Sequence, residues 1–269
     1  MAATDKLFAG SIPEIYDRFL APLIFESYAR DLAERLARAE PREVLETAAG
    51  TGVLTRAIAA RLPAPARIGV TDLNQPMLDH AQRQSHDSRI TWRQADALAL
   101  PFEDQKFDVV ACQFGAMFFP DATQGYKEAL RVLKPGGRFI FNVWDRIATN
   151  EFADVVTTAL ATVFPADPPR FMARIPHGYY DTDKIRSQLT AAGFTKVAIS
   201  PVERTSRAPS ARDAAVGYCQ GTPTRSEIEA HDGSRLEEAT ERAAEALARR
   251  FGAGPIEGHM RAFAIEAVG

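Results

Sequence analysis

The stretch Val44-Leu45-Glu46-Thr47-Ala48-Ala49-Gly50-Thr51-Gly52 decides the fold of this chain. It begins as a short apolar strand, passes through a turn of small residues and leads into a helix expected from Val53 to Leu62. Alanine and glycine carry little or nothing beyond Cα, so a ligand can approach the backbone of such a turn closely. The first N–H groups of the helix have no partner within the helix. The stretch therefore predicts a ligand-binding strand–turn–helix.

Strands and helices alternate on the C-terminal side of this stretch. Apolar runs typical of strands occupy 43–47, 67–71, 89–94, 107–112 and 138–144, with two more near 195–203 and 259–267. Helical patterns occupy 52–62, 75–84, 122–133 and 182–192, and Gly193 ends the last of them. This alternation predicts βαβ units and an α/β fold with a mostly parallel sheet.

Three segments fall outside the alternation. The N-terminal segment predicts a short helix over 12–20, with Ser11 as its N-cap, and a longer helix that opens at Pro22. The last segment predicts a main helix that begins at Ser234, with Glu237 completing a capping box. We expect N-terminal helices at 1–40, a core at 41–145, a cap insertion at 146–180, more core at 181–207, a second cap insertion at 208–257 and a final strand at 258–269.

The composition argues against several classes of protein. A net charge of −3 lacks the basic excess of a nucleic-acid-binding surface. No window approaches the roughly 20 apolar residues of a membrane span, and residues 1–10 lack the apolar core of a signal peptide. Cys112 and Cys219 have neither metal-ligand nor disulfide-framework spacing, so we expect two buried free thiols and no metal. These features favour a cytoplasmic protein, and they leave the oligomeric state open.

Four further motifs follow the opening stretch. The second strand ends in Asp72-Leu73-Asn74-Gln75-Pro76-Met77, and the third in Gln94-Ala95-Asp96-Ala97. The fourth leads to Gln113-Phe114-Gly115, and Leu130-Arg131-Val132-Leu133-Lys134-Pro135-Gly136-Gly137 precedes the fifth. In order and spacing these motifs resemble those of the small-molecule branch of class I S-adenosylmethionine (SAM) dependent methyltransferases. The resemblance covers about residues 42–145 and implies a Rossmann-like, seven-stranded sheet with helices on both faces and a helical cap.

The resemblance implies a SAM site, with S-adenosylhomocysteine as the product. Asp72 would bind the ribose diol, and Asp96 with the N–H of Ala97 would read the amino edge of adenine; the alternatives are a helix cap and a solvated loop acid. Tyr16 is similar to an N-terminal tyrosine that closes over SAM, or it is a core residue. The full set of expected cofactor contacts is Tyr16, Glu46, Thr47, Ala48, Gly50, Gly52, Asp72, Leu73, Met77, Asp96, Ala97, Gln113 and Phe114.

The opening motif departs from the family pattern at two positions. Glu46 stands where the family usually has aspartate, and it can still accept hydrogen bonds through a longer arm. Ala48 stands where the family has glycine, and it tolerates close approach less well. These departures favour, as an alternative, a SAM-binding protein without catalysis on the same fold.

A second alternative is a nicotinamide-dependent oxidoreductase. Its fingerprint requires a small residue at the position of Thr55, where helix and strand pack closely. The threonine at that position disfavours this class. An oxidoreductase would also leave the Asp96 and Pro135-Gly136-Gly137 motifs without an explanation.

The methyl acceptor is expected to be a small, partly apolar molecule. Aromatic residues of the insertions and of the fourth-strand motif either line its pocket or form ordinary core; those expected to line it are Phe118, Phe119, Trp144, Tyr179 and Tyr180. Transfer would be an in-line displacement, for which the protein mainly aligns the two reactants. His177 is the candidate general base, or else a structural histidine, and His259 could also face the pocket. His80, His86 and His231 are expected to face solvent.

Overall fold

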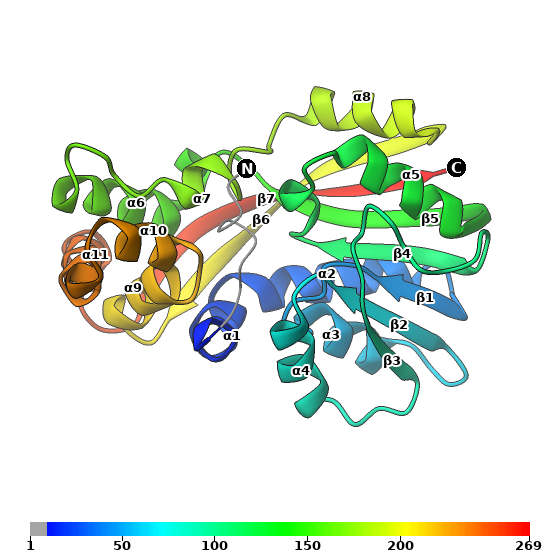
Figure 1. Ribbon diagram of the computed structural model, residues 1–269, viewed down its shortest axis with the longest axis horizontal. Helices are drawn as coiled ribbons and strands as arrows, with labels where there is room; N and C mark the ends of the chain where they lie inside the picture. The colour runs from blue at the N-terminus through cyan, green and yellow to red at the C-terminus, as the bar shows by residue number, and fades with distance from the viewer. Residues whose placement is uncertain (1–9) are drawn as a thin grey trace. The chain divides into compact units, whose positions relative to one another are not determined.

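The computed structural model describes residues 10–269, which divide into two compact units (Figure 1). The sheet unit comprises Tyr28–Val143, Tyr180–Val202 and Ala262–Gly269. The helical unit comprises the described residues up to Ser27, together with Trp144–Tyr179 and Glu203–Arg261. The expectation about a signal peptide concerned residues that lie almost entirely outside the described part of the chain.

The sheet has seven strands in the order β3-β2-β1-β4-β5-β7-β6. Its strands are β1 (Glu43–Glu46), β2 (Arg67–Asp72), β3 (Ile90–Gln94), β4 (Phe107–Gln113), β5 (Leu133–Trp144), β6 (Lys196–Ala208) and β7 (Ile256–Val268). The pairs β1–β2, β1–β4, β2–β3 and β4–β5 are parallel. The order reverses direction beside β1, so the carboxyl ends of β1 and β4 flank the switch point at which open α/β sheets bind ligands. The expected seven-stranded, mostly parallel sheet is confirmed.

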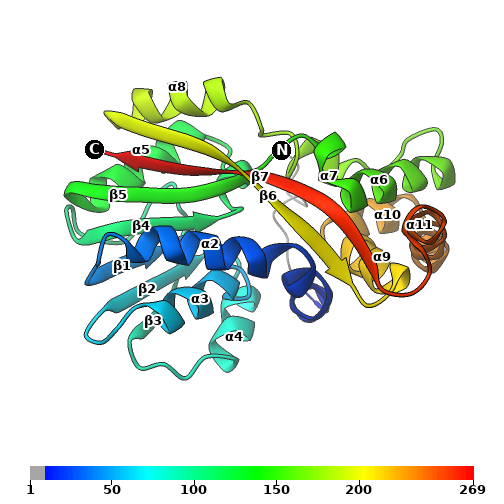
Figure 2. The same ribbon diagram turned by 180° about the vertical axis from the view of Figure 1, so that it is seen from behind.

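Helices cover both faces of the sheet in its own unit. Figure 2 shows α2 (Glu26–Ala37) and α3 (Val53–Arg61) in front of the strands, whereas Figure 1 shows α5 (Ala122–Val132) in front of them. α4 (Gln75–Arg83) packs on β2 and β3, and α8 (Thr182–Ala192) packs on α5. The strands are buried almost throughout β1 and β4, as parallel strands covered on both faces should be.

The helical unit is built around α11 (Leu236–Phe251), which packs on α6 (Glu151–Val163) and α9 (Ala211–Gln220). α9 also packs on η2 (Tyr16–Phe25), where the absence of a side chain at Gly217 leaves room for Leu20. The remaining helices of the two units are α1 (Ile12–Ile15), η3 (Ala116–Phe118), η4 (Ile147–Thr149), α7 (Phe171–Arg174), α10 (Thr224–Asp232) and η5 (Gly233–Arg235). No helix among residues 10–269 is long and apolar enough to cross a membrane.

Three local predictions about helix ends are wrong. Pro22 does not open a helix but lies inside η2, a π-helix that runs on into α2. The Ser11 side chain does not cap α1; its hydroxyl instead accepts a hydrogen bond from Arg225 at 2.8 Å. The capping box at Ser234 does not form, because the Ser234 N–H and hydroxyl donate to Asp232 and α11 begins only at Leu236. Both serines thus have hydrogen-bond partners other than the helix ends that they were expected to cap.

Candidate functional site

The turn after β1 is held in a left-handed conformation. Ala48, Gly50 and Gly52 have φ values of +52°, +57° and +78°. Gly52 precedes α3, and no side chain caps the N-terminus of that helix. The backbone N–H of Thr47 donates to Ala111 O at 2.9 Å. This hydrogen bond fixes the turn at the switch point of the sheet, and α3 begins directly after the turn.

Asp72 lies at the end of β2 and bonds to this turn. Its Oδ2 accepts from the N–H of Gly50 at 2.8 Å, and its Oδ1 accepts from the N–H of Asn74 at 2.8 Å. Burial raises the pKa of Asp72, while the bonds from Asn74 and Gly50 act to lower it. The neighbouring Leu73 is 43% exposed, and the Met77 methyl lies 3.6 Å from where a Cβ on Gly50 would stand. The structure therefore brings Gly50, Asp72, Leu73 and Met77 together.

Glu46 is fully buried at the end of β1. Its Oε2 accepts a hydrogen bond from the Thr55 hydroxyl of α3 at 2.6 Å, whereas its Oε1 has no partner among the described residues. Desolvation by burial raises the pKa of Glu46 to about 8. The carboxyl group is therefore mostly protonated at pH 7, and its orphaned oxygen is a buried polar atom that a donor on a ligand would satisfy.

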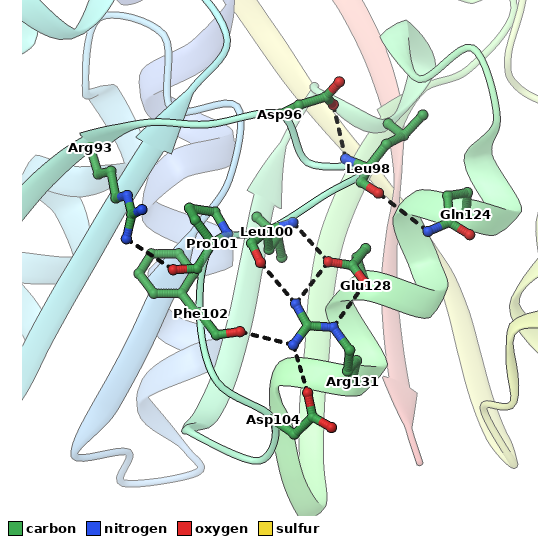
Figure 3. Close-up of polar contacts among 10 residues, drawn as sticks. All are labelled: Arg93, Asp96, Leu98, Leu100, Pro101, Phe102, Asp104, Gln124, Glu128 and Arg131. Carbon is green, nitrogen blue, oxygen red and sulfur yellow. Dashed lines mark hydrogen bonds and ion pairs between the residues drawn. The ribbon is translucent and has the colours of Figure 1, made fainter.

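Asp96 and Ala97 follow Ala95 in the connection from β3 to β4, in which Figure 3 labels Asp96. Asp96 is exposed, and its Oδ1 accepts from the N–H of Leu98 at 2.9 Å. The Gln94 side chain donates to Leu73 O at 2.8 Å, which ties this connection to the loop that follows Asp72. Asp96 is thus a loop residue that caps its own turn, and its Oδ2 makes no hydrogen bond to the described residues.

Phe114 is a buried residue with a positive φ of +50° after β4. Its N–H donates to the Asn142 side chain at 2.9 Å, and its ring meets Tyr28 edge-on at 5.3 Å. The neighbouring Gln113 is half-buried, as are Phe118 and Phe119. Phe114 therefore packs as a core aromatic, and its contribution to the cofactor site stays a prediction.

A second candidate site lies wholly within the helical unit. Its small pocket is lined by Ile24, Trp144, Asn150, Phe152, His177, Ser206, Tyr218, His259 and Met260. His177 is 4% exposed, and its Nδ1 lies 2.8 Å from Asp145 O. A carbonyl oxygen can only accept, so Nδ1 carries the proton and Nε2 keeps its lone pair. Burial lowers the pKa of His177 to about 4, so the ring is neutral at pH 7.

The other predicted site residues are divided between the two units. Tyr16 belongs to the helical unit, where it stacks on Phe25 at 5.0 Å. Tyr179 belongs to that unit too, whereas Tyr180 belongs to the sheet unit and is 39% exposed. Of the residues expected to line the acceptor pocket, Trp144 is buried in the helical unit, as are four further apolar side chains of the insertions: Phe152, Phe164, Phe171 and Met172.

The histidine predictions are partly wrong. His86 and His231 are exposed as expected. His80 is buried on α4, where its Nε2 lies 2.8 Å from the side-chain nitrogen of Gln84 one turn later. The predicted free thiols are confirmed, since both Cys112 and Cys219 are free and buried. No group of metal-ligating side chains occurs among residues 10–269.

Sequence reasoning missed several residues of these sites. Thr55 was read only as a departure from a nucleotide fingerprint, yet its hydroxyl holds Glu46. Asn142 holds the turn after β4, and its place near the end of β5 was the available signal. Tyr218 and Ser206 join His177 in its pocket from distant parts of the chain, and no local pattern marks them.

Comparisons with known proteins agree with the fold and with the expected class of enzyme. Residues 44–137 match the family model described as "Methyltransferase domain". The chain is 33% identical over 167 residues to the demethylmenaquinone methyltransferase of Deinococcus radiodurans, covering 61% of this chain and 69% of that protein. It is 29% identical over 168 residues to the ubiquinone/menaquinone biosynthesis C-methyltransferase UbiE of Idiomarina loihiensis, covering 58% and 67%.

Solved structures show the same fold. Phosphoethanolamine N-methyltransferase 2 of Haemonchus contortus, solved in complex with S-adenosyl-L-methionine, superposes with a TM-score of 0.57 at 17% identity. The match covers 95% of this chain and 56% of that one. At this identity the likeness concerns the fold alone.

Proposed function

Since the chain belongs to the class I SAM-dependent methyltransferases and is an enzyme that uses SAM, we propose that its methyl acceptor is a hydroxylated quinone-type ring. The observation that carries this proposal is the similarity of the sequence to a demethylmenaquinone methyltransferase and to a ubiquinone/menaquinone biosynthesis C-methyltransferase. The acceptor form would be the reduced ring, because a hydroquinone carbon is nucleophilic and a quinone carbon is not.

We propose that SAM is held by the sheet unit. The fit rests on three features: an acid at the end of β2 whose carboxylate is already oriented, an exposed Leu73 beside it, and an orphaned oxygen on Glu46. Asp72 would accept hydrogen bonds from the ribose hydroxyls, and Leu73 and Met77 would pack on adenine. When bound, SAM supplies an electrophilic methyl group on a sulfonium that leaves as a neutral thioether.

The protein's own part in the transfer is positioning. An in-line displacement needs the acceptor carbon about 3–3.5 Å from the methyl and aligned with the bond that breaks. We propose that His177, in a small pocket of the helical unit that Trp144 and Phe152 also line, is the general base toward the acceptor. Because Nδ1 donates to Asp145 O, Nε2 can accept a hydrogen bond from an acceptor hydroxyl and then its proton.

The test is calorimetric titration with SAM and S-adenosylhomocysteine, followed by transfer of a labelled methyl group to reduced demethylmenaquinone. One-site binding and a ring-methylated product are expected. Binding without transfer to this ring, or transfer only to an amine, would refute the proposed acceptor. With the acceptor established, His177→Ala should lower kcat about 100-fold, the usual size of a lost acid–base group; an unchanged kcat would remove His177 from the reaction.

A further inference from the structure

The connection from β3 to β4 carries Asp96 and Ala97 but contains no helix or strand. Its first residue is fixed by the sheet, because the N–H of Ala95 donates to Asp72 O at 3.0 Å. Beyond that point its exposed backbone would be free to move unless another element held it. Figure 3 shows that α5 makes most of the contacts that hold it, while Arg93 of β3 donates to Pro101 O at 2.9 Å.

Arg131, on the last turn of α5, uses all of its hydrogen-bond donors. Nη1 donates to Phe102 O at 2.8 Å and to the Asp104 carboxylate at 2.6 Å, and Nη2 donates to Leu100 O at 2.8 Å. Nε and Nη2 form a bidentate pair with Glu128, each at 2.8 Å. A guanidinium group has five N–H donors in a planar fork, and here five acceptors meet them.

Glu128 and Gln124 extend this clamp along the same face of α5. The Glu128 carboxylate accepts from the N–H of Leu100 at 2.7 Å, and the Gln124 side chain donates to Leu98 O at 3.2 Å. Arg131 lowers the pKa of Glu128, so the acid is ionised at neutral pH. The Glu128 side chain is only 13% exposed and that of Arg131 31%, so solvent screens the pair less than an open surface pair.

Residues 96 and 97 lie between Ala95, which the sheet holds, and Leu98, which α5 holds. Hydrogen bonds within the turn fix their conformation. The Asp96 carboxylate accepts from the N–H of Leu98, and the N–H of Ala99 donates to Asp96 O at 3.0 Å. Leu98 is the residue that Gln124 holds, and Leu100 is held by both Glu128 and Arg131. The direction of the Asp96 carboxylate therefore depends on α5.

We propose that Arg131, with Glu128, is a positioning residue for adenine recognition. By fixing residues 98–104 against α5, it holds the Asp96 carboxylate and the Ala97 N–H where they read the amino edge of the base. The inference rests on the proposed function, since the adenine contacts of Asp96 and Ala97 are part of it. Arg131 itself touches neither cofactor nor acceptor, and it sets how well adenine is distinguished from a base that lacks the amino group.

The test compares two ligands, S-adenosylhomocysteine and S-inosylhomocysteine, in which an oxygen replaces the adenine amino group. Their Kd values are measured by calorimetry for the wild type and for Arg131→Lys. Lysine keeps the charge but cannot supply five donors in a plane. We expect the Kd of S-adenosylhomocysteine to rise about tenfold, the equivalent of one good hydrogen bond, and that of S-inosylhomocysteine to change little. The Kd ratio, defined as the Kd of S-inosylhomocysteine divided by that of S-adenosylhomocysteine, should therefore fall about tenfold.

Arg89→Lys is the matched control. Arg89 also clamps a loop of the sheet unit, through Leu62 O, Ala59 O and the Asp87 carboxylate. Its loss should lower the melting temperature in the same way but leave the Kd ratio unchanged. An equal fall of the ratio in both variants would show a general loosening and overturn the inference. Should Arg131→Lys not fold, Glu128→Gln keeps the shape of the clamp and should lower the ratio about threefold, as a weakened hydrogen bond would.

Asp96→Ala separates failure of the inference from failure of the proposed function. If this variant leaves the ratio unchanged, adenine is not read by Asp96, and the proposed site is wrong together with the inference. If Asp96→Ala lowers the ratio while Arg131→Lys and Glu128→Gln do not, the site stands and the positioning role of Arg131 is refuted. A fall of the ratio in all three variants supports both.

Discussion

The side chain of Ala48 occupies the space in which a side chain on Gly115 would have to lie. A Cβ built on Gly115 would overlap the Ala48 Cβ and would lie 2.7 Å from the sulfur of Cys112. Ala48 also has a positive φ of +52°, a conformation that costs an L-residue with a Cβ roughly 1–2 kcal/mol. Ala48 stands where the family usually has glycine, and the absence of a side chain at Gly115, in the turn after β4, leaves room for its Cβ.

Gly115→Ala should lower the free energy of unfolding by about 1–3 kcal/mol, because overpacking forces neighbouring atoms to move. Gly69→Ala in β2 is the control, since its Cβ would meet the nearest atom at an ordinary 3.5 Å. Urea unfolding measures both. Ala48→Gly should restore part of the stability lost in Gly115→Ala, since the overlap with the Cys112 sulfur remains, and a double-mutant cycle without coupling would contradict the contact with Ala48.

Asp72→Ala should raise the Kd of S-adenosylhomocysteine about 100-fold, because the ribose would lose two hydrogen bonds to a charged group. Asp79→Ala is the control, since Asp79 is an exposed acid of α4 that bonds to Gln75. Calorimetry gives both values. An unchanged Kd in Asp72→Ala would show that the ribose does not bind at the end of β2.

Acid should destabilise the protein through His177. Its folded pKa of about 4 lies below the ordinary value of 6.5, so only the unfolded chain takes up the proton between these values. The contribution is fully present above pH 6.5 and is lost as the pH falls toward 4. Between pH 7 and pH 5 the wild type should lose about 2 kcal/mol more than His177→Gln. Denaturant unfolding at the two pH values measures this difference, with the exposed His86→Gln as control; equal losses would place His177 in a more polar environment.

Alkali should destabilise the protein through Glu46. Its folded pKa of about 8 lies above the ordinary 4.5, so the unfolded chain loses its proton first as the pH rises. The stabilisation is complete below pH 4.5 and disappears as the pH rises through 8, with a slope of up to about 1.4 kcal/mol per pH unit. Glu46→Gln resembles the protonated acid and should show a flatter profile between pH 5 and pH 8. Parallel profiles for the two proteins would mean that Glu46 is ionised when folded.

The parts of the fold that depend on local pattern could be predicted from the sequence. Strand β1, the small-residue turn and α3 occur where the alternation placed them, because a buried parallel strand and an amphipathic helix leave different periodicities. Leu23, Tyr28, Leu32 and Leu36 are four or five residues apart in the sequence, close to helical spacing, and all four are buried. The helix ends were harder: at Ser234 a neighbouring acid outcompeted the expected cap.

The parts of the sites that depend on distant contacts could not be predicted. Tyr218 reaches the pocket of His177 from a helix about 40 residues further along the chain, and only the packing of the helical unit brings them together. The contacts of Arg131 could not be predicted from its motif, because two of its five acceptors are backbone carbonyls, which carry no sequence signature, and Asp104 lies 27 residues away in the sequence.

The carboxylate of Asp72 is preorganised. Each of its oxygens is already held by a backbone N–H, one from the turn after β1 and one from the start of α4. Immobilising a mobile side chain on binding costs of the order of 0.5–1.5 kcal/mol, and here that loss of rotational entropy occurs when the chain folds. A nucleoside bound as we propose would meet an acid that needs no reorientation, so its association should involve little conformational adjustment in this part of the protein.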